Sequence, residues 1–109
     1  MLMAARGRQA ARNEDFFRTS NEIELDESAS RGRRPDFLCE CSRPGCVVRV
    51  PISPEDYEHV RARGNRFVVA PLHVDASVEV IVELHNGYVI VEKVGSAGDE
   101  ARRLDPRPD

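Results

Sequence analysis

The chain has 109 residues, of which 40% are hydrophobic and 32% are charged, and its formal net charge is −3. This length allows one small domain with a modest core, and no apolar run reaches the roughly 20 residues of a transmembrane helix. The negative net charge gives no overall attraction to nucleic acid, and the N-terminus lacks the apolar stretch of a signal peptide. We therefore expect a cytoplasmic protein that does not enter the membrane.

Residues 1–12 predict a disordered basic tail. They contain Arg6, Arg8 and Arg12, no acidic residue, and little apolar surface to bury. A segment of this composition does not offset the entropy lost on folding. A solvated terminus is the main interpretation, and an arm that binds nucleic acid is the alternative.

Residues 13–27 predict a helix that begins at Asn13, a good N-cap residue. Its apolar side chains include Phe16, Phe17 and Ile23, which form a narrow stripe at helical spacing. The segment also carries six acidic residues and a single arginine. One interpretation is an amphipathic helix that docks through its two phenylalanines. The other is an acidic helix that binds another protein through Phe16 and Phe17.

Residues 28–35 predict a solvated linker with a basic run, which can contact either phosphate or the acidic helix before it. Residues 36–40 and 47–50 then predict the two strands of an antiparallel hairpin, because valine and phenylalanine suit a half-buried pleated surface. Ser42-Arg-Pro-Gly45 is the turn between them.

All the cysteines lie in this hairpin, at Cys39, Cys41 and Cys46. Two residues that are two apart on a strand share a face, and Cys46 returns across the turn toward that face. In a reducing compartment, clustered thiols favour metal or redox chemistry over a structural disulfide. We expect a zinc site, and three buried cysteines that pack without a metal are the alternative.

Residues 53–64 predict a short helix with the clearest start in the chain. Ser53 is the N-cap, Pro54 occupies the first helical position, and two acids follow. Tyr57 and Val60 face inward, one turn apart, and Gly64 ends the helix.

Residues 67–70 predict a third strand, and residues 78–84 and 88–93 a hairpin around Asn86-Gly87. The expected register pairs His85 with Tyr88, Leu84 with Val89 and Val82 with Val91, with Val78, Val80, Val82 and Leu84 on one apolar face. Residues 95–109 predict a flexible tail. The sequence thus predicts an α+β domain over 13–94, with an N-terminal helix, a zinc-knuckle hairpin, a second helix and three further antiparallel strands.

The knuckle lacks a fourth ligand, and His73 is the best candidate because it follows a strand expected beside the hairpin. His85 and His59 are the alternatives. A filled site of three thiolates and one imidazole has no open position, so the zinc is expected to be structural. We expect Arg43 and Arg49 to offset the remaining negative charge and to donate hydrogen bonds to the sulfurs.

Four stretches resemble a group of small, uncharacterised, zinc-ribbon-like bacterial proteins over residues 13–94. They are Phe37-Leu-Cys-Glu-Cys with Cys46, Pro54-Glu-Asp-Tyr57, Phe67-Val-Val-Ala-Pro71 with His73, and Gly87-Tyr-Val-Ile-Val-Glu-Lys93. The resemblance implies no activity, but it implies that the three cysteines and His73 belong to one site.

These features favour a small zinc-stabilised interaction or regulatory module that is not an enzyme. One alternative is nucleic-acid binding, through arginines that include Arg43, Arg49, Arg61, Arg63 and Arg66. The other is a thiol redox sensor that releases zinc when two cysteines form a disulfide.

Overall fold

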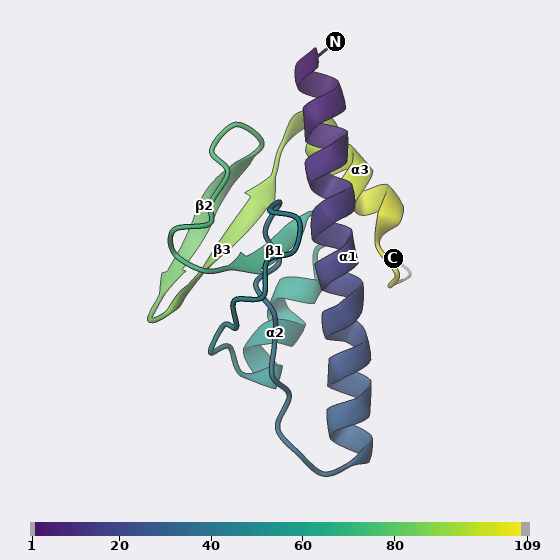
Figure 1. The fold of residues 1–109 in the computed structure, drawn as a ribbon, viewed down its shortest axis with the longest axis vertical. Helices are drawn as coiled ribbons and strands as arrows, with labels where there is room; N and C mark the ends of the chain where they lie inside the picture. Colours follow the sequence, from purple (N-terminus) through teal and green to yellow (C-terminus); the bar gives the residue numbers. More distant parts are fainter. Residues whose placement is uncertain (1, 108–109) are drawn as a thin grey trace.

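The computed structural model describes residues 2–107 of the chain, and the side chains of residues 9–107. It confirms the predicted α+β class, with three helices and a three-stranded antiparallel sheet of order β1-β3-β2 (Figure 1). The elements are α1 (Leu2–Ser30), α2 (Pro54–Arg61), β1 (Arg66–Val69), β2 (Glu79–His85), β3 (Tyr88–Lys93) and α3 (Gly95–Leu104). Within the described residues, no helix has the length and apolarity needed to cross a bilayer.

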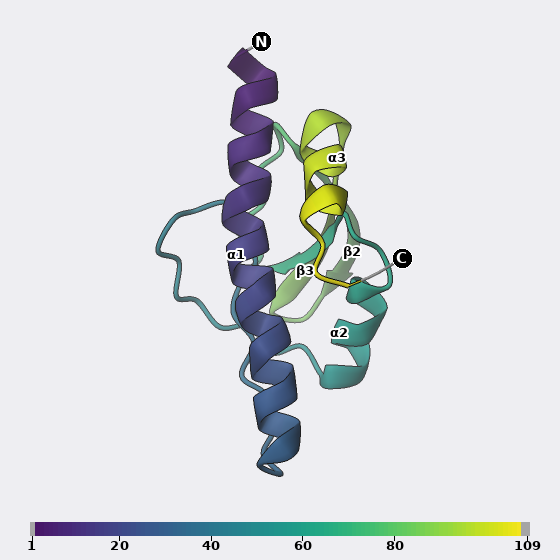
Figure 2. The same ribbon diagram turned by 90° about the vertical axis from the view of Figure 1, so that its right-hand side faces the viewer.

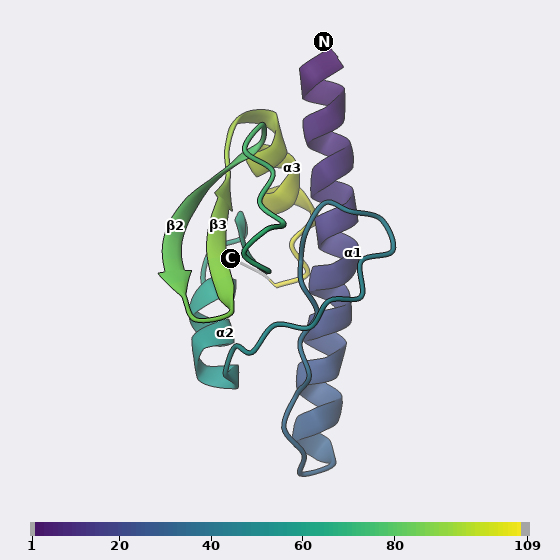
Figure 3. The ribbon, with the colours of Figure 1, turned by 60° about the vertical axis from the view of Figure 1, so that its left-hand side comes forward.

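The long helix α1 runs the full height of the molecule along one side of the sheet. Figure 2 shows α1 and α3 side by side in front of the sheet, with α2 lower down. In Figures 1 and 3, β2 is the edge of the sheet that lies farthest from α1. The sheet therefore has one edge that faces away from the helices.

Helix α1 begins at Leu2, so the prediction of a disordered tail over residues 1–12 is wrong for the described part. Alanine, arginine, leucine, methionine and glutamine dominate this segment, and all of them favour helix. Ala10 and Ala11 are buried, because their small side chains allow neighbouring elements to pack closely. The burial of Ala10 and Ala11 was not apparent from the sequence pattern.

The buried face of α1 is more polar than the sequence suggested. Phe17 is buried as predicted, but Phe16 is 68% exposed and Ile23 is 54% exposed. Arg18 is fully buried, and its guanidinium donates to the carbonyl oxygens of Gly64 and Ala101 at 2.6 and 2.9 Å. Buried polar groups with such partners are tolerated, so the helix is oriented by its hydrogen bonds as much as by apolar contact.

Helix α2 matches its prediction closely. The hydroxyl group of Ser53 accepts a 3.1 Å hydrogen bond from the Asp56 amide, and Tyr57 and Val60 are buried. Arg61 is also buried, between Glu22 and Asp105. This buried ion-pair group joins α2, α1 and the C-terminal segment.

The hairpin of β2 and β3 turns at Gly87, whose φ of 85° suits glycine. His85 pairs with Tyr88 and Leu84 with Val89, as predicted. A bulge between Ile81 and Glu83 then shifts the register, so Ile81 rather than Val82 pairs with Val91. The predicted pairing of Val82 with Val91 is therefore wrong, because one extra residue enters the edge strand.

The bulged strand β2 also exposes apolar residues that the alternating pattern placed inside. Val80 and Leu84 are 47% and 76% exposed, because β2 lies at the sheet edge beyond the reach of the helices. Glu79 takes the opposite role, since it is buried and its carboxylate lies 2.5 Å from the Nζ atom of Lys93.

The prediction of a flexible tail over residues 95–109 is wrong up to Arg107, and residues 108–109 lie outside the described part. Helix α3 buries Ala97 and Ala101 and packs along α1. Arg107 then forms ion pairs with Glu22 and Glu58. Small residues and charges, which indicated a loose end, here permit close helix contact and supply ion pairs.

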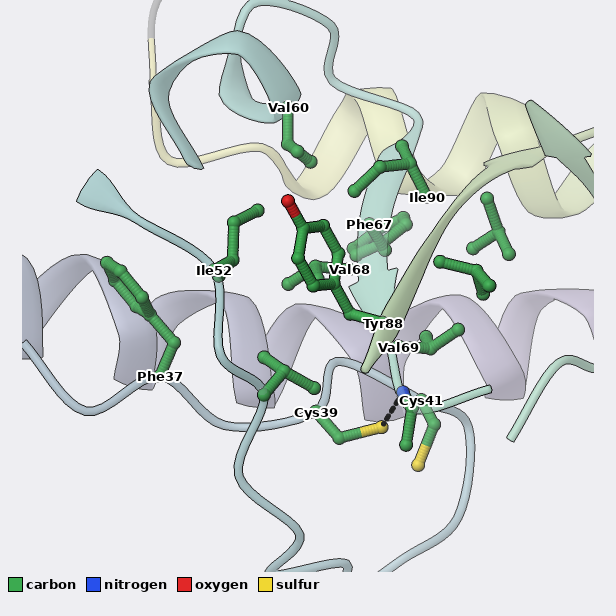
Figure 4. Close-up of a cluster of buried hydrophobic side chains, with 14 of the residues drawn as sticks. Phe37, Cys39, Cys41, Ile52, Val60, Phe67, Val68, Val69, Tyr88 and Ile90 are labelled. Carbon is green, nitrogen blue, oxygen red and sulfur yellow. Dashed lines mark hydrogen bonds between the residues drawn. The ribbon is translucent and has the colours of Figure 1, made fainter. Parts of the chain in front are cut away.

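One hydrophobic cluster fills the space between the helices and the sheet (Figure 4). The rings of Phe37 and Tyr57 stack with centroids 4.4 Å apart, which joins the hairpin segment to α2. Cys39 and Cys41 belong to the same cluster, and Figure 4 shows their sulfurs at one end of it, near Val69. The thiol cluster is thus an extension of the core.

Candidate metal centre

The two predicted strands of the cysteine hairpin pair over a short distance. The Cys39 amide donates to the Val48 carbonyl at 2.8 Å, and the Val50 amide donates to the Phe37 carbonyl at 3.0 Å. The Pro44-Gly45 turn closes with a 3.2 Å hydrogen bond from the Cys46 amide to the Arg43 carbonyl. Gly45 has a φ of 74°, a conformation that favours glycine.

This hairpin lies against the free edge of β1. The Glu40 amide donates to the Val68 carbonyl at 2.7 Å, and the Ala70 amide donates to Sγ of Cys39 at 3.2 Å. A turn then follows in which the His73 amide donates to the Ala70 carbonyl at 2.9 Å. The end of β1 therefore brings His73 to the face of the hairpin that carries the thiols.

The four predicted ligands, Cys39, Cys41, Cys46 and His73, lie together, with ligand atoms all within 4.8 Å of one another. The Nδ1 atom of His73 is 3.5 Å from Sγ of Cys39 and 3.6 Å from Sγ of Cys46. In a tetrahedral zinc site the standard bond lengths put sulfur and nitrogen roughly 3.6 Å apart. The spacing is therefore that of a set of ligands around one small ion.

Burial differs across this cluster. Cys39 and Cys41 have no exposed surface, whereas Cys46 and His73 are half-buried. An ion at this place would be held from the core by two sulfurs and covered from outside by the turn and the imidazole. Solvent therefore reaches the cluster from the side of Cys46 and His73.

The other two histidines lie elsewhere. His59 is exposed on α2, and the ring of His85 stacks on Tyr88 and contacts Glu83 at 2.8 Å. The preference for His73 in the sequence rested on its strand and loop position, and the structure places it beside the sulfurs.

The guanidinium groups of Arg43 and Arg49 donate to backbone carbonyls and not to the sulfurs. Arg43 donates to the Leu72 carbonyl at 3.1 Å, and Arg49 donates to the Asp36 carbonyl at 2.9 Å. The donors to sulfur are instead backbone amides, that of Ala70 to Cys39 and that of Arg43 to Cys41. The Arg43 side chain also ties down the loop that carries His73, through the Leu72 carbonyl.

Without a metal, the thiols share protons unevenly. A hydrogen bond from the Cys39 thiol lowers the pKa of Cys41 to about 5, because it stabilises the Cys41 thiolate. The same hydrogen bond raises the pKa of Cys39, and burial raises it further. A metal ion bound to all three thiolates must therefore displace at least the Cys39 proton, so its affinity falls as the pH falls.

Glu40, which the sequence pattern did not indicate, links the segment between Cys39 and Cys41 to the surrounding elements. Its side chain is fully buried and accepts hydrogen bonds from Tyr57 at 2.6 Å, Asn21 at 3.0 Å and the Val68 amide at 3.1 Å. A glutamate between two inward-facing cysteines normally points to solvent, so nothing in the local pattern signals this role.

The arginines proposed as a basic surface are largely neutralised by acids. Arg61 is paired with Glu22 and Asp105, Arg66 lies 3.1 Å from Glu92, and Arg49 lies 3.7 Å from Asp36. Paired guanidinium groups offer less charge to phosphate than the sequence suggested.

Comparison of the chain with protein-family models, curated proteins and solved structures found no match. The resemblance to small bacterial proteins therefore stays a prediction from the sequence motifs.

Proposed function

We propose that the protein is a small zinc-stabilised interaction or regulatory module, and that its zinc is structural. The observation that carries the proposal is the convergence of three thiols and one imidazole nitrogen within 4.8 Å. Two of the thiols come from one strand-like segment, the third from beyond the turn, and the imidazole from a loop after β1.

The donor chemistry favours zinc. Thiolate and imidazole groups suit Zn²⁺, whereas magnesium and calcium prefer oxygen ligands. Four protein ligands also fill the coordination shell of zinc, which leaves no position for a reactive water molecule. This supports a structural role rather than a catalytic one.

The energetic role follows from the position of the cluster. The zinc would link the cysteine hairpin to the loop after β1, two segments that are otherwise joined by few backbone hydrogen bonds. In small domains, the free energy of metal binding contributes directly to the free energy of folding.

The interaction role is supported by α1. Phe17 is buried and so does not serve as a contact residue, but Phe16 and Ile23 are exposed on the same helix. Exposed aromatic and aliphatic side chains on an otherwise charged helix are typical of a contact surface for another protein. The contact surface proposed for α1 is therefore centred on Phe16 and Ile23.

Native mass spectrometry, with and without a chelator, tests the metal. We expect one zinc per chain, lost on chelation, and weaker retention in His73→Ala, whereas His85→Ala serves as the matched control with a histidine outside the cluster. A metal-free chain after zinc supplementation, or equal losses in both variants, would overturn the proposed site.

A redox sensor is the second candidate, favoured by the proximity of the three sulfurs. A peroxide would transfer one oxygen atom to a thiolate and form a sulfenic acid. The rest of the peroxide would leave as water or as an alcohol. A second thiol would then displace water from the sulfenic acid to form a disulfide. Two ligands would be lost, so zinc release at low peroxide, measured with a chromogenic chelator, would support this role.

A further inference from the structure

The outward face of α1 carries a stripe of residues that no other part of the described chain covers. The exposed positions recur at alternating intervals of four and three residues, as on one side of a helix that packs against another helix. They are Arg12, Phe16, Thr19, Ile23, Asp26 and Ser30. Figure 2 shows that no other element lies in front of α1, between α3 and the segment that precedes α2.

The middle of the stripe is apolar and its ends have opposite charge. Phe16 and Ile23 are the apolar residues, 68% and 54% exposed. Arg12 stands at one end with its side chain 57% exposed, 3.8 Å from Glu100. Asp26 of the stripe and its neighbour Glu27 are exposed toward the other end, and no ion pair of either is found within residues 9–107.

A face with this order is complementary to itself when two copies run in opposite directions. A twofold axis near Thr19 and Ser20 brings Phe16 of one copy opposite Ile23 of the other. The same axis brings Arg12 opposite Glu27 at both ends. A parallel arrangement would instead place like charges side by side, which is unfavourable.

We propose that α1 is the interface of a homodimer, in which the helices of two copies pack antiparallel through this face. The proposal deepens the interaction role given to α1 above and rests on it, but it does not depend on the metal. The occupant is a second copy because one helix face supplies both the apolar pair and both signs of charge.

A surface hollow beside Phe16 supports the fit. It has a volume of about 170 Å³ and is lined by Asn13, Phe16, Phe17, Pro44 and Gly45. An isoleucine side chain from a neighbouring helix is of a size to enter it, so Ile23 of the second copy has a place to pack. The small residues Thr19 and Ser20 at the crossing point allow the two helices to approach closely.

The contact is short, so we expect a weak dimer whose population depends on concentration and salt. Sedimentation equilibrium of the full chain over a wide concentration range measures it directly. Phe16→Glu and Ile23→Glu should each weaken the dimer by about tenfold or more, because each places a charge in the apolar centre. Both residues are exposed, so the fold should survive, which circular dichroism and zinc content can check.

Charge reversal provides the sharper experiment. R12E and E27R should each weaken the dimer, since each sets like charges opposite one another, and the double variant R12E/E27R should recover it. Leu84→Glu on the edge strand β2 is the matched control, because Leu84 is 76% exposed and lies outside the stripe. Its dimer should be unchanged.

A chain that stays monomeric at all concentrations would overturn the inference, as would a dimer that persists in Phe16→Glu or dissociates in Leu84→Glu. Failure of the charge-reversed double variant to recover association would overturn the antiparallel pairing. Zinc content measured on the same samples separates the two proposals. A zinc-loaded monomer contradicts only the dimer, and a zinc-free dimer contradicts only the metal site.

Discussion

The hydroxyl group of Tyr57 donates a 2.6 Å hydrogen bond to Oε2 of Glu40, deep in the core. Glu40 separates the two fully buried cysteines, so this bond connects the middle of α2 to the centre of the thiol cluster. Burial raises the pKa of Glu40, and the hydrogen bonds from Tyr57 and Asn21 counteract that rise. The ionised form of the Glu40 carboxylate is thus stabilised by the hydrogen bonds that it accepts.

Tyr57→Phe should therefore destabilise the protein by about 1–3 kcal/mol, because it removes a donor from a buried acceptor and leaves the ring packing intact. Urea denaturation of the metal-loaded protein measures the loss. Tyr88→Phe is the matched control, since Tyr88 is also buried but no hydrogen bond of its hydroxyl group is found in the described residues. Equal losses in the two variants would contradict the role assigned to Glu40.

The pH dependence of stability should carry a contribution from Glu14. Its side chain is fully buried, and burial raises its pKa well above the usual value, although Lys93 at 2.6 Å opposes the rise. The folded state therefore keeps a proton that the unfolded state has already lost. Stability from this group is complete below the unfolded pKa, near 4.3, and falls as the pH rises toward the folded pKa.

Glu14→Gln abolishes that titration and so isolates it. We expect the stability of the wild type, measured relative to Glu14→Gln, to decrease between pH 5 and pH 8, by at most about 1.4 kcal/mol per pH unit. Urea titrations of both proteins across this range give the difference, in which the pH dependence of zinc binding cancels. Glu55→Gln, at an exposed position of α2, should show no such trend. A constant difference would mean that Glu14 stays ionised in the fold.

The C-terminal segment should contribute to stability through Asp105. This carboxylate pairs with Arg61, whose side chain has no exposed surface. Asp105→Asn leaves that guanidinium with Glu22 alone, so we expect a loss of about 1–3 kcal/mol in urea denaturation. Asp99→Asn on α3 is the control, because Asp99 is 83% exposed beside Arg102 and such surface pairs contribute little. If Asp105→Asn left the stability unchanged, helix packing would instead hold this segment in place.

Removal of the proposed zinc should also lower stability. The metal would join the hairpin to the loop of His73, and its loss would leave three crowded thiols in their place. We expect chelation to lower Tm by about 10 °C or more, which corresponds to roughly 2 kcal/mol or more for a domain of this size. Differential scanning fluorimetry with and without chelator checks this. An unchanged Tm would rule out a stabilising metal.

Local patterns predicted α2 and the β2–β3 turn well, because the residues that mark them restrict their own backbone. Proline at the first helical position of α2, a serine cap, and glycine in the turn restrict the backbone whatever the surroundings. The cysteine spacing and the placement of His73 beside them also followed from local rules. Strand alternation put Cys39 and Cys41 on one face, and the loop after Pro71 put His73 within reach.

The predictions that failed concern which surface each element buries. Residues 2–12 and 95–104 contain few large apolar side chains, yet both are helical, and their alanines are buried where α1 and α3 pack together. Phe16 and Ile23 look like core residues in the sequence, yet α1 turns them outward to bury Arg18 and Asn21. That choice depends on partners such as Gly64 and Leu38, far along the chain.

The sequence by itself determined the turn chemistry, the start of α2 and which three thiols and one imidazole form the candidate metal cluster. Only the tertiary structure decided which face of α1 is inside, that Glu40 and Lys93 are buried, and that Val80 and Leu84 are not. The physical reason is range. Backbone restriction acts over a few neighbouring residues, whereas the burial of a charge depends on donors and counter-ions that arrive from distant segments.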